Sequence, residues 1–251
     1  MKTVICALLA PLLLLGSVQA TAAQSVDEIV ERHLTASGGR AALEKLTSRA
    51  LTGTITLPTP GGDLSGPIEV LTAKPARERT LISLDLSVFG AGKITVDRRF
   101  DGTAGFVIDT LQGDRDVSGL ELQNMRNDAA AFPNPFLTYK QAGTSLTLRG
   151  KEKVGDRDAY VLLVEPKSGS TIRVYIDAET FLSVKAISTA EAPQIGQFEQ
   201  TTELLDYRDV DGVKVPFLIK STSTAQSFSI AVTRIEHNVK VDPSIFAKPA
   251  K

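Results

Sequence analysis

The sequence predicts an α+β fold that is mainly β: one large curved antiparallel sheet with a few helices covering one face. Apolar and polar residues alternate with a period of two in about twelve segments, as in strands with one buried face. Helical periodicity is confined to residues 25–46 and 118–131. Turn residues join neighbouring strand segments as hairpins, and no linker divides the chain. These three observations favour a single antiparallel domain.

The amino terminus has the pattern of a secretory signal peptide. Lys2 precedes an apolar run, Val4–Leu15, and the small-residue site Val18-Gln19-Ala20 follows. The run has 12 residues, fewer than the roughly 18 that a membrane span needs. We therefore expect residues 1–20 to be removed and residues 21–251 to form one soluble periplasmic domain. An uncleaved membrane anchor is the alternative.

The composition excludes several classes of protein. Cys6 is the only cysteine and lies in the apolar run, so the mature chain would have neither disulfides nor thiol chemistry. Without residues 1–20, 27 basic residues face 29 acidic ones, and the basic clusters lack interleaved aromatic residues. The sequence therefore predicts no nucleic-acid partner.

Two helices are expected at the start of the mature chain. Ser25 and Glu28 have the spacing of a capping box, in which each side chain reaches the backbone N–H of the other residue. Apolar residues then recur at helical spacing from Val26 to Leu34, and Gly38-Gly39 ends the helix because glycine adopts the left-handed conformation easily. A second short helix is predicted at residues 40–46.

Five strands are expected in the first half of the chain. They are predicted at residues 51–57, 68–72, 82–88, 93–100 and 105–109. The clearest alternation places one set of apolar side chains on a single face: Ile82, Leu84, Leu86 and Val88.

A helix and an unusual connector interrupt the strands. Ser118 and Glu121 form a second possible capping box for a helix reaching about Ala131. Residues 132–137 follow with the sequence Phe-Pro-Asn-Pro-Phe-Leu, which is apolar but contains two prolines and so does not suit a central strand. A loop packed on the core and a mobile lid are both compatible with this connector.

Seven further strands are expected in the second half. They are predicted at residues 145–149, 159–165, 171–176, 183–188, 201–207, 214–221 and 227–235. Residues 177–180 and 209–212 have the composition of hairpin turns.

No catalytic or metal-binding motif is present. His33 and His237 are far apart in the sequence, and neither has a second histidine nearby. The acidic residues fall at turns and helix caps, where their side chains bond the local backbone. We therefore expect no catalytic residue, no bound metal and no cofactor.

The alternating strands supply much apolar surface. If small helices do not fill the concave side of a curved sheet, a cavity remains that holds an acyl chain; a fully packed core is the alternative. The candidate lining residues are Leu51, Ile55, Ile82, Leu84, Leu86, Val88, Phe106, Met125, Phe132 and Phe136.

Turn and strand signatures occur in order at residues 26–46, 53–54, 100–106, 148–152, 175–182 and 206–217. These segments resemble the LolA/LppX-like superfamily of exported bacterial lipoprotein-sorting proteins. This resemblance implies a half-open β-barrel closed by helices around an apolar cavity for lipid or lipoprotein acyl chains. Phe106 stands where relatives commonly have tryptophan. The resemblance does not identify which residue of this chain corresponds to the family's functional arginine.

The expected function is that of a monomeric periplasmic carrier or chaperone for a lipid or lipoprotein acyl chain. An envelope membrane protein is a further expected partner. The alternative is a sensing or adaptor domain that regulates a membrane or protease partner through the same cavity. An unrecognised hydrolase is the weakest interpretation.

Overall fold

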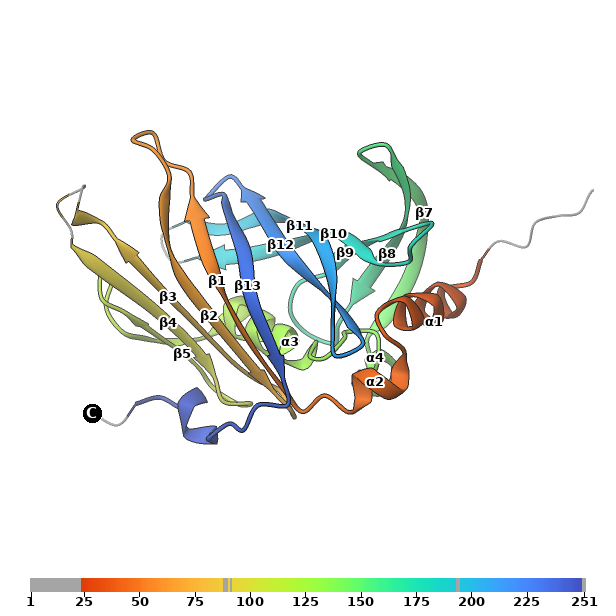
Figure 1. The fold of residues 1–251 in the computed structure, drawn as a ribbon, viewed down its shortest axis with the longest axis horizontal. Helices are drawn as coiled ribbons and strands as arrows, with labels where there is room; N and C mark the ends of the chain where they lie inside the picture. The colour runs from red at the N-terminus through yellow and green to blue at the C-terminus, as the bar shows by residue number, and fades with distance from the viewer. Residues whose placement is uncertain (1–23, 88–89, 91, 193–194, 250–251) are drawn as a thin grey trace, which may run out of the picture.

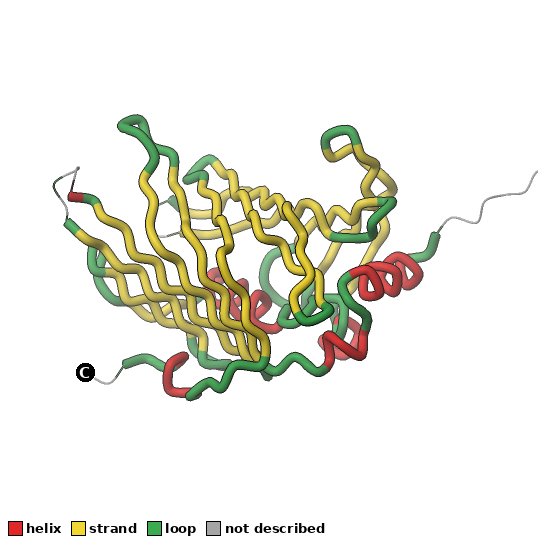
Figure 2. The backbone as a smooth tube through the Cα atoms, in the orientation of Figure 1, coloured by secondary structure: helices red, strands yellow, loops and turns green. Residues whose placement is uncertain are grey.

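A computed structural model describes residues 24–249, except 88–89, 91 and 193–194. Within these residues, thirteen strands form one antiparallel sheet in the order β6-β5-β4-β3-β2-β1-β13-β12-β11-β10-β9-β8-β7. The sheet curves without closing into a barrel, and few helices accompany it (Figures 1 and 2). The predicted mainly β, half-open architecture is therefore confirmed. The signal-peptide prediction falls outside the described residues.

One arm of the sheet comes from the first half of the chain and the other arm from the second half. The first half contains α1 (Val26–Ala36), α2 (Arg40–Glu44), β1 (Ser48–Leu57), β2 (Leu64–Ala73), β3 (Arg77–Asp85), β4 (Lys93–Phe100), β5 (Gly105–Asp109), β6 (Arg115–Val117) and α3 (Gly119–Ala130). The second half contains α4 (Tyr139–Ala142), β7 (Ser145–Val154), β8 (Arg157–Glu165), β9 (Ile172–Asp177), β10 (Ser183–Ala192), β11 (Gly196–Val210), β12 (Val213–Ser223), β13 (Phe228–His237) and a 3₁₀ helix (Pro243–Phe246).

Helix α1 begins and ends where the sequence predicts. The Ser25 hydroxyl accepts a hydrogen bond from the Glu28 N–H at 3.1 Å, whereas the Glu28 carboxylate accepts from the Gln24 side chain instead of completing the box. Gly38 follows the helix with φ of 121°, and a Cβ there would overlap the carbonyl oxygen of Gly212. Glycine thus lets the helix end approach the β11–β12 turn closely.

The inner face of the sheet is identified by strand alternation and register. Phe100 of β4 packs against Met125 of α3, and Phe100 pairs with Glu78 of β3. Because side chains alternate, Ile82 and Leu84 lie on the same face of β3 as Glu78, toward α3. This is the concave face of the curved sheet (Figure 1).

Strand β3 is shorter at its carboxyl end than the alternation predicts. It ends at Asp85, whose Oδ1 accepts a hydrogen bond from the Ser87 N–H at 2.9 Å. The Leu86 N–H still donates to the carbonyl oxygen of Gly92 at 2.7 Å, so the chain turns directly after the end of the strand. Leu86 therefore lies just beyond the strand, and Val88 lies outside the described residues.

Helix α3 lies within the curve of the sheet and connects its two arms. Met125 belongs to a core cluster with residues of β4, β5 and β6. Asn124 donates to the carbonyl oxygen of Thr189 on β10 at 3.0 Å and accepts from the Ser170 N–H at the same distance. The helix thus holds the two arms at a fixed separation.

The predicted capping box at the start of α3 is wrong. The Ser118 side chain makes no capping bond within the described residues. The Glu121 carboxylate instead accepts two hydrogen bonds from the guanidinium of Arg115, at 2.7 and 2.9 Å. Arg115 belongs to β6, a three-residue strand absent from the prediction, as is α4.

Candidate ligand-binding site

The central part of the inner face carries an apolar cluster made of strand residues. Its buried members are Ile55, Ile68 and Leu84, and its half-buried members are Leu57, Leu64, Val70, Ile82, Ile94, Phe228 and Ile230. They come from β1, β2, β3, β4 and β13. This inner apolar cluster therefore presents partly exposed apolar side chains on a concave surface.

A cavity of about 350 Å³ adjoins this cluster, between α3 and the two arms of the sheet. Val96 of β4 lines the cavity and pairs with Ile82 of the apolar cluster. Most other lining residues are polar or charged: Arg98, Asp109, Gln112, Arg115, Glu121, Asn124, Asn127, Asp128, Ser188 and Gln200. We refer to it as the polar cavity.

Acidic side chains are in excess around Arg98. Its guanidinium lies 3.7 Å from the Glu121 carboxylate, which Arg115 already engages. Burial raises the pKa of Glu78 to about 7, and the neighbouring Asp128 adds to the increase, whereas Arg98 opposes it. Burial also raises the pKa of Asp128. The Glu78 and Asp128 carboxyl groups thus share one neighbouring guanidinium, that of Arg98, which does not fully offset their negative charge.

A second cavity, of about 560 Å³, lies at the base of the molecule beside the connector 132–137. Its lining residues are Glu44, Lys74, Pro75, Ala130, Phe132, Pro133, Asn134, Leu137 and Thr138. We refer to it as the base cavity. It separates the connector from the β2–β3 turn.

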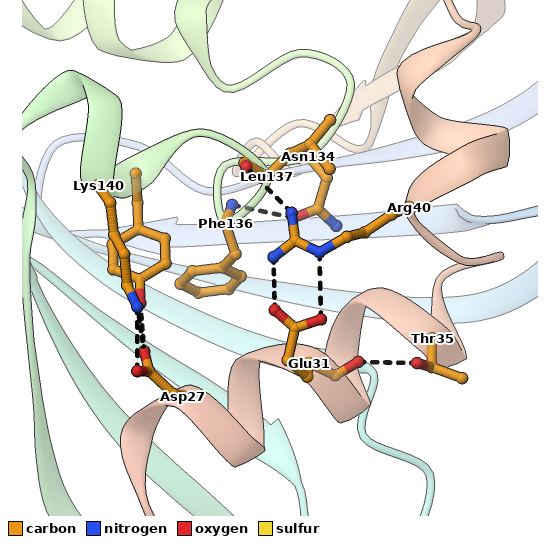
Figure 3. Close-up of polar contacts among 9 residues, drawn as sticks. Asp27, Glu31, Thr35, Arg40, Asn134, Phe136, Leu137 and Lys140 are labelled. Atoms are coloured by element: carbon orange, nitrogen blue, oxygen red, sulfur yellow. Dashed lines mark hydrogen bonds and ion pairs between the residues drawn. The ribbon is translucent and has the colours of Figure 1, made fainter.

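The connector is held against α1 by polar contacts (Figure 3). Arg40 makes two hydrogen bonds to Glu31, at 2.5 and 3.1 Å, and a third to the carbonyl oxygen of Leu137 at 3.4 Å. Lys140, just after the connector, pairs with Asp27 at 2.9 Å. These contacts, with a Phe136 side chain that is 1% exposed, favour the packed loop over the mobile lid.

The structure brings three of the predicted lining residues together. Ile55, Ile82 and Leu84 all belong to the inner apolar cluster. Leu51, Phe132 and Phe136 instead belong to a larger core with α1, and Met125 fills the core beneath α3.

Phe106 lies on the outer face. It neighbours the inward-facing Val107 on β5, so its side chain points the opposite way. Lys248, from the carboxyl-terminal tail, lies 4.4 Å from the Phe106 ring centroid. Phe106 is therefore not part of the concave face, contrary to the prediction.

The residues of the polar cavity were missed because they lie on separate elements. The sequence nevertheless contains a signal for this cavity. Arg98 has the same two-residue spacing as the inward-facing Ile94 and Val96. Glu78 has the same spacing as the inward-facing Thr80 and Ile82. Charged residues at inward-facing strand positions indicate a polar interior.

No protein-family profile and no curated protein matches the sequence significantly. Three solved structures resemble the fold. A LolA superfamily protein from Nitrosomonas europaea has a TM-score of 0.57 and 15% identity, over 90% of this chain and 99% of that chain. The chain therefore has the same fold as this LolA superfamily protein.

Two further structures share this LolA-like fold. A DUF1329 family protein from Desulfovibrio piger has a TM-score of 0.56 and 14% identity, over 88% of this chain and 97% of its own. A candidate outer membrane lipoprotein-sorting protein domain from Vibrio parahaemolyticus has a TM-score of 0.56 and 11% identity, over 87% and 94%. At these identities the comparison establishes the fold.

The described residues contain neither a candidate membrane-spanning helix nor a cluster of metal ligands. No helix in this part of the chain is long and apolar enough to cross a membrane. No three histidine, cysteine, aspartate or glutamate side chains among the described residues are grouped as a metal site requires.

Proposed function

We propose that this protein is an exported, periplasmic carrier that binds the acyl chain of a lipid or lipoprotein on the concave face of its sheet. The observation that carries the proposal is the inner apolar cluster, whose half-buried side chains belong to strands and adjoin a cavity. A bound chain would gain about 0.8 kcal/mol for each methylene removed from water, before ordering costs. The LolA-like fold and the signal-peptide pattern support the proposal.

Mass spectrometry of organic-solvent extracts tests it directly, on protein purified from its native periplasm. We expect a co-purified molecule with at least one acyl chain. Amino-terminal sequencing of the same protein should give Thr21, or Gln24 if cleavage follows Ala23. Retention of Met1 in a membrane fraction would contradict the proposed location.

A matched pair of variants on β3 tests the binding surface. Ile82 and Leu81 are both half-buried neighbours, but only Ile82 faces the inner cluster. Ile82→Asn should weaken binding of a fluorescent fatty acid about tenfold, the loss expected for about 1.4 kcal/mol of apolar contact. Leu81→Asn should leave the affinity within about twofold. Equal losses in both variants would argue against the inner face as the binding surface.

A further inference from the structure

A third cavity, of about 200 Å³, lies at the base of the molecule, where the carboxyl-terminal segment passes beneath the strands (Figure 1). Thr47 and Ser48 line it at the start of β1, Lys74 and Arg77 line it at the β2–β3 turn, and the segment after β13 closes it. We refer to it as the tail cavity. A cavity needs only about 10–15 Å³ to hold one water molecule, so this one has room for a larger ligand.

The wall formed by the carboxyl-terminal segment is fixed by contacts with the strands. The Ser48 hydroxyl donates to the carbonyl oxygen of Val239 at 2.6 Å, and the Thr47 hydroxyl donates to the Asn238 side chain at 3.1 Å. Phe246, farther along the segment, is 2% exposed. The cavity is therefore preformed, and its two hydroxyl groups already donate to protein acceptors.

Two half-buried cations line the tail cavity, and each contacts only a backbone carbonyl group. The Lys74 ammonium donates to the carbonyl oxygen of Glu44 at 2.9 Å, and Nε of Arg77 donates to that of Asp101 at 3.2 Å. In the part of the chain that the structure describes, neither cation forms an ion pair, and the two terminal nitrogens of Arg77 have no hydrogen-bond partner. Both side chains therefore retain N–H groups for a ligand.

The neighbouring acids are engaged elsewhere. Asp97 pairs with Arg79 and Arg99, at 2.7 Å each. The Asp101 carboxylate accepts from backbone N–H groups of its own turn, and Asp242 accepts from the first turn of the 3₁₀ helix. No acidic side chain of the described residues lines the tail cavity, whereas acids line both the polar cavity and the base cavity. The lining thus carries two positive charges and no negative one.

We propose that the tail cavity binds a terminal phosphate group, held by the Lys74 ammonium and the terminal nitrogens of the Arg77 guanidinium. A terminal phosphate carries a charge of about −1.5 to −2 at pH 7, which matches two cations. The guanidinium suits a pair of phosphate oxygens, and the ammonium acts as a point charge. A carboxylate, with one negative charge, would leave one cation uncompensated.

This inference does not depend on the proposed carrier function. Arg77 precedes the inward-facing Glu78 on β3, so its side chain lies on the outer face of the sheet. The tail cavity is therefore separated by the sheet from the inner apolar cluster.

Calorimetric titration with inorganic phosphate, near pH 7.5 and about 0.15 M salt, tests the site. Lys74→Gln and Arg77→Gln should each weaken phosphate binding at least about tenfold, as expected for loss of a charge-assisted hydrogen bond. Lys240→Gln is the matched control, because Lys240 is exposed and lies between the lining residues Val239 and Val241 without lining the cavity itself. Its affinity should stay within about twofold of the wild type, since salt screens an exposed charge.

Phosphatidylcholine vesicles with and without phosphatidic acid, which ends in a phosphate, distinguish a lipid source from a soluble one. Co-sedimentation with the phosphatidic acid vesicles that both cavity variants lose would place the phosphate on a lipid. Binding of inorganic phosphate alone would place it on a soluble molecule. Melting temperatures without phosphate identify the variants that fold, and Lys74→Gln decides if Arg77→Gln does not. Absence of binding to both sources, unchanged affinity in the cavity variants, or an equal loss in Lys240→Gln would overturn the proposal.

Discussion

The imidazole Nε2 of His33 accepts a hydrogen bond from the side-chain amide of Asn134, with 3.0 Å between the two nitrogens. The other ring nitrogen, Nδ1, donates to the carbonyl oxygen of Phe181 at 2.8 Å. The buried ring is therefore neutral, with its proton on Nδ1. It joins α1, the connector 132–137 and the β9–β10 turn, which are far apart in the sequence.

Loss of the Asn134 side chain should destabilise this junction. Asn134→Ala removes the acceptor of the Phe136 N–H, which donates to Asn134 Oδ1 at 3.0 Å, and leaves Nε2 of His33 with only the more distant Ser37 hydroxyl, at 3.4 Å. The loss of these two buried hydrogen bonds should cost about 3 kcal/mol and lower the melting temperature by roughly 6–12 °C. Gln141→Ala, at an exposed position on α4, should change it by less than about 2 °C. Similar melting of both variants would show that the junction contributes little.

His33 should also make the folded state sensitive to acid. Burial lowers the pKa of His33 from 6.5 to about 4, although the bond to Phe181 opposes the shift. Between these values the unfolded chain binds a proton that the folded chain excludes. Stability should therefore decrease as the pH falls from 6.5 to 4, by up to about 3 kcal/mol from this group.

Urea unfolding across this pH range measures the effect, and His33→Gln isolates it. Glutamine does not titrate, so the difference between the two proteins removes the contribution of the carboxyl groups. The wild type should lose more stability than the variant as the pH falls. Parallel curves would contradict the role of His33.

Most of the helices and strands follow from local sequence patterns, and the differences between the predicted and the observed elements have physical causes. Strand β6 escaped prediction because three residues are too few to display a period of two. The expected extension of β3 to Val88 overlooked Asp85, a residue type whose side chain competes with the ladder. Glu121 has the spacing of a capping residue but binds Arg115, because a guanidinium is a stronger partner than a backbone N–H.

The candidate site was predictable only in part. Alternation alone placed Ile82 and Leu84 on one face with Ile55 nearby. The polar cavity depends on the approach of α3 to both arms of the sheet, which no local pattern encodes. Phe106 was predicted to line the cavity, although its position in the alternation of β5, next to the inward-facing Val107, places it on the outer face.

Glu78 should lower stability at neutral and higher pH. Its folded pKa is about 7, above the unfolded value of 4.5, so the folded state prefers the protonated acid. The stability from this preference is present below pH 4.5 and is lost as the pH rises through 7. Glu78→Gln should therefore be more stable than the wild type by about 2 kcal/mol above pH 7, and equally stable below pH 4.5.

Chemical denaturation at the two pH extremes tests this expectation. Glu69→Gln is the control, since Glu69 is exposed on neighbouring β2. It should leave stability unchanged at both extremes. A destabilised Glu78→Gln protein at high pH would mean that the carboxylate has a stabilising partner. The expected result would show that the ionised Glu78 side chain lowers the stability of the folded protein.

Phe136 should be a core residue and not part of a gate. Its ring is buried and meets the His33 ring edge-on, with 5.1 Å between centroids. Phe136→Ser should therefore create a cavity and cost about 3 kcal/mol or more, seen as a large drop in melting temperature. A small drop together with weaker fatty-acid uptake would instead support the mobile lid.

The acyl chain should occupy the inner apolar cluster and not the base cavity. A ligand at a free concentration 100 times its dissociation constant stabilises the folded state by about 2.7 kcal/mol, a rise of roughly 5–10 °C in melting temperature. The Ile82→Asn variant should bind the ligand about tenfold more weakly. At the same ligand concentration its folded state should therefore be stabilised by only about 1.4 kcal/mol. Ala130→Phe adds a ring at an exposed residue that lines the base cavity, so it should narrow that cavity and leave the full rise unchanged. If Ala130→Phe abolishes the rise while Ile82→Asn retains it, the chain enters the molecule beside the connector.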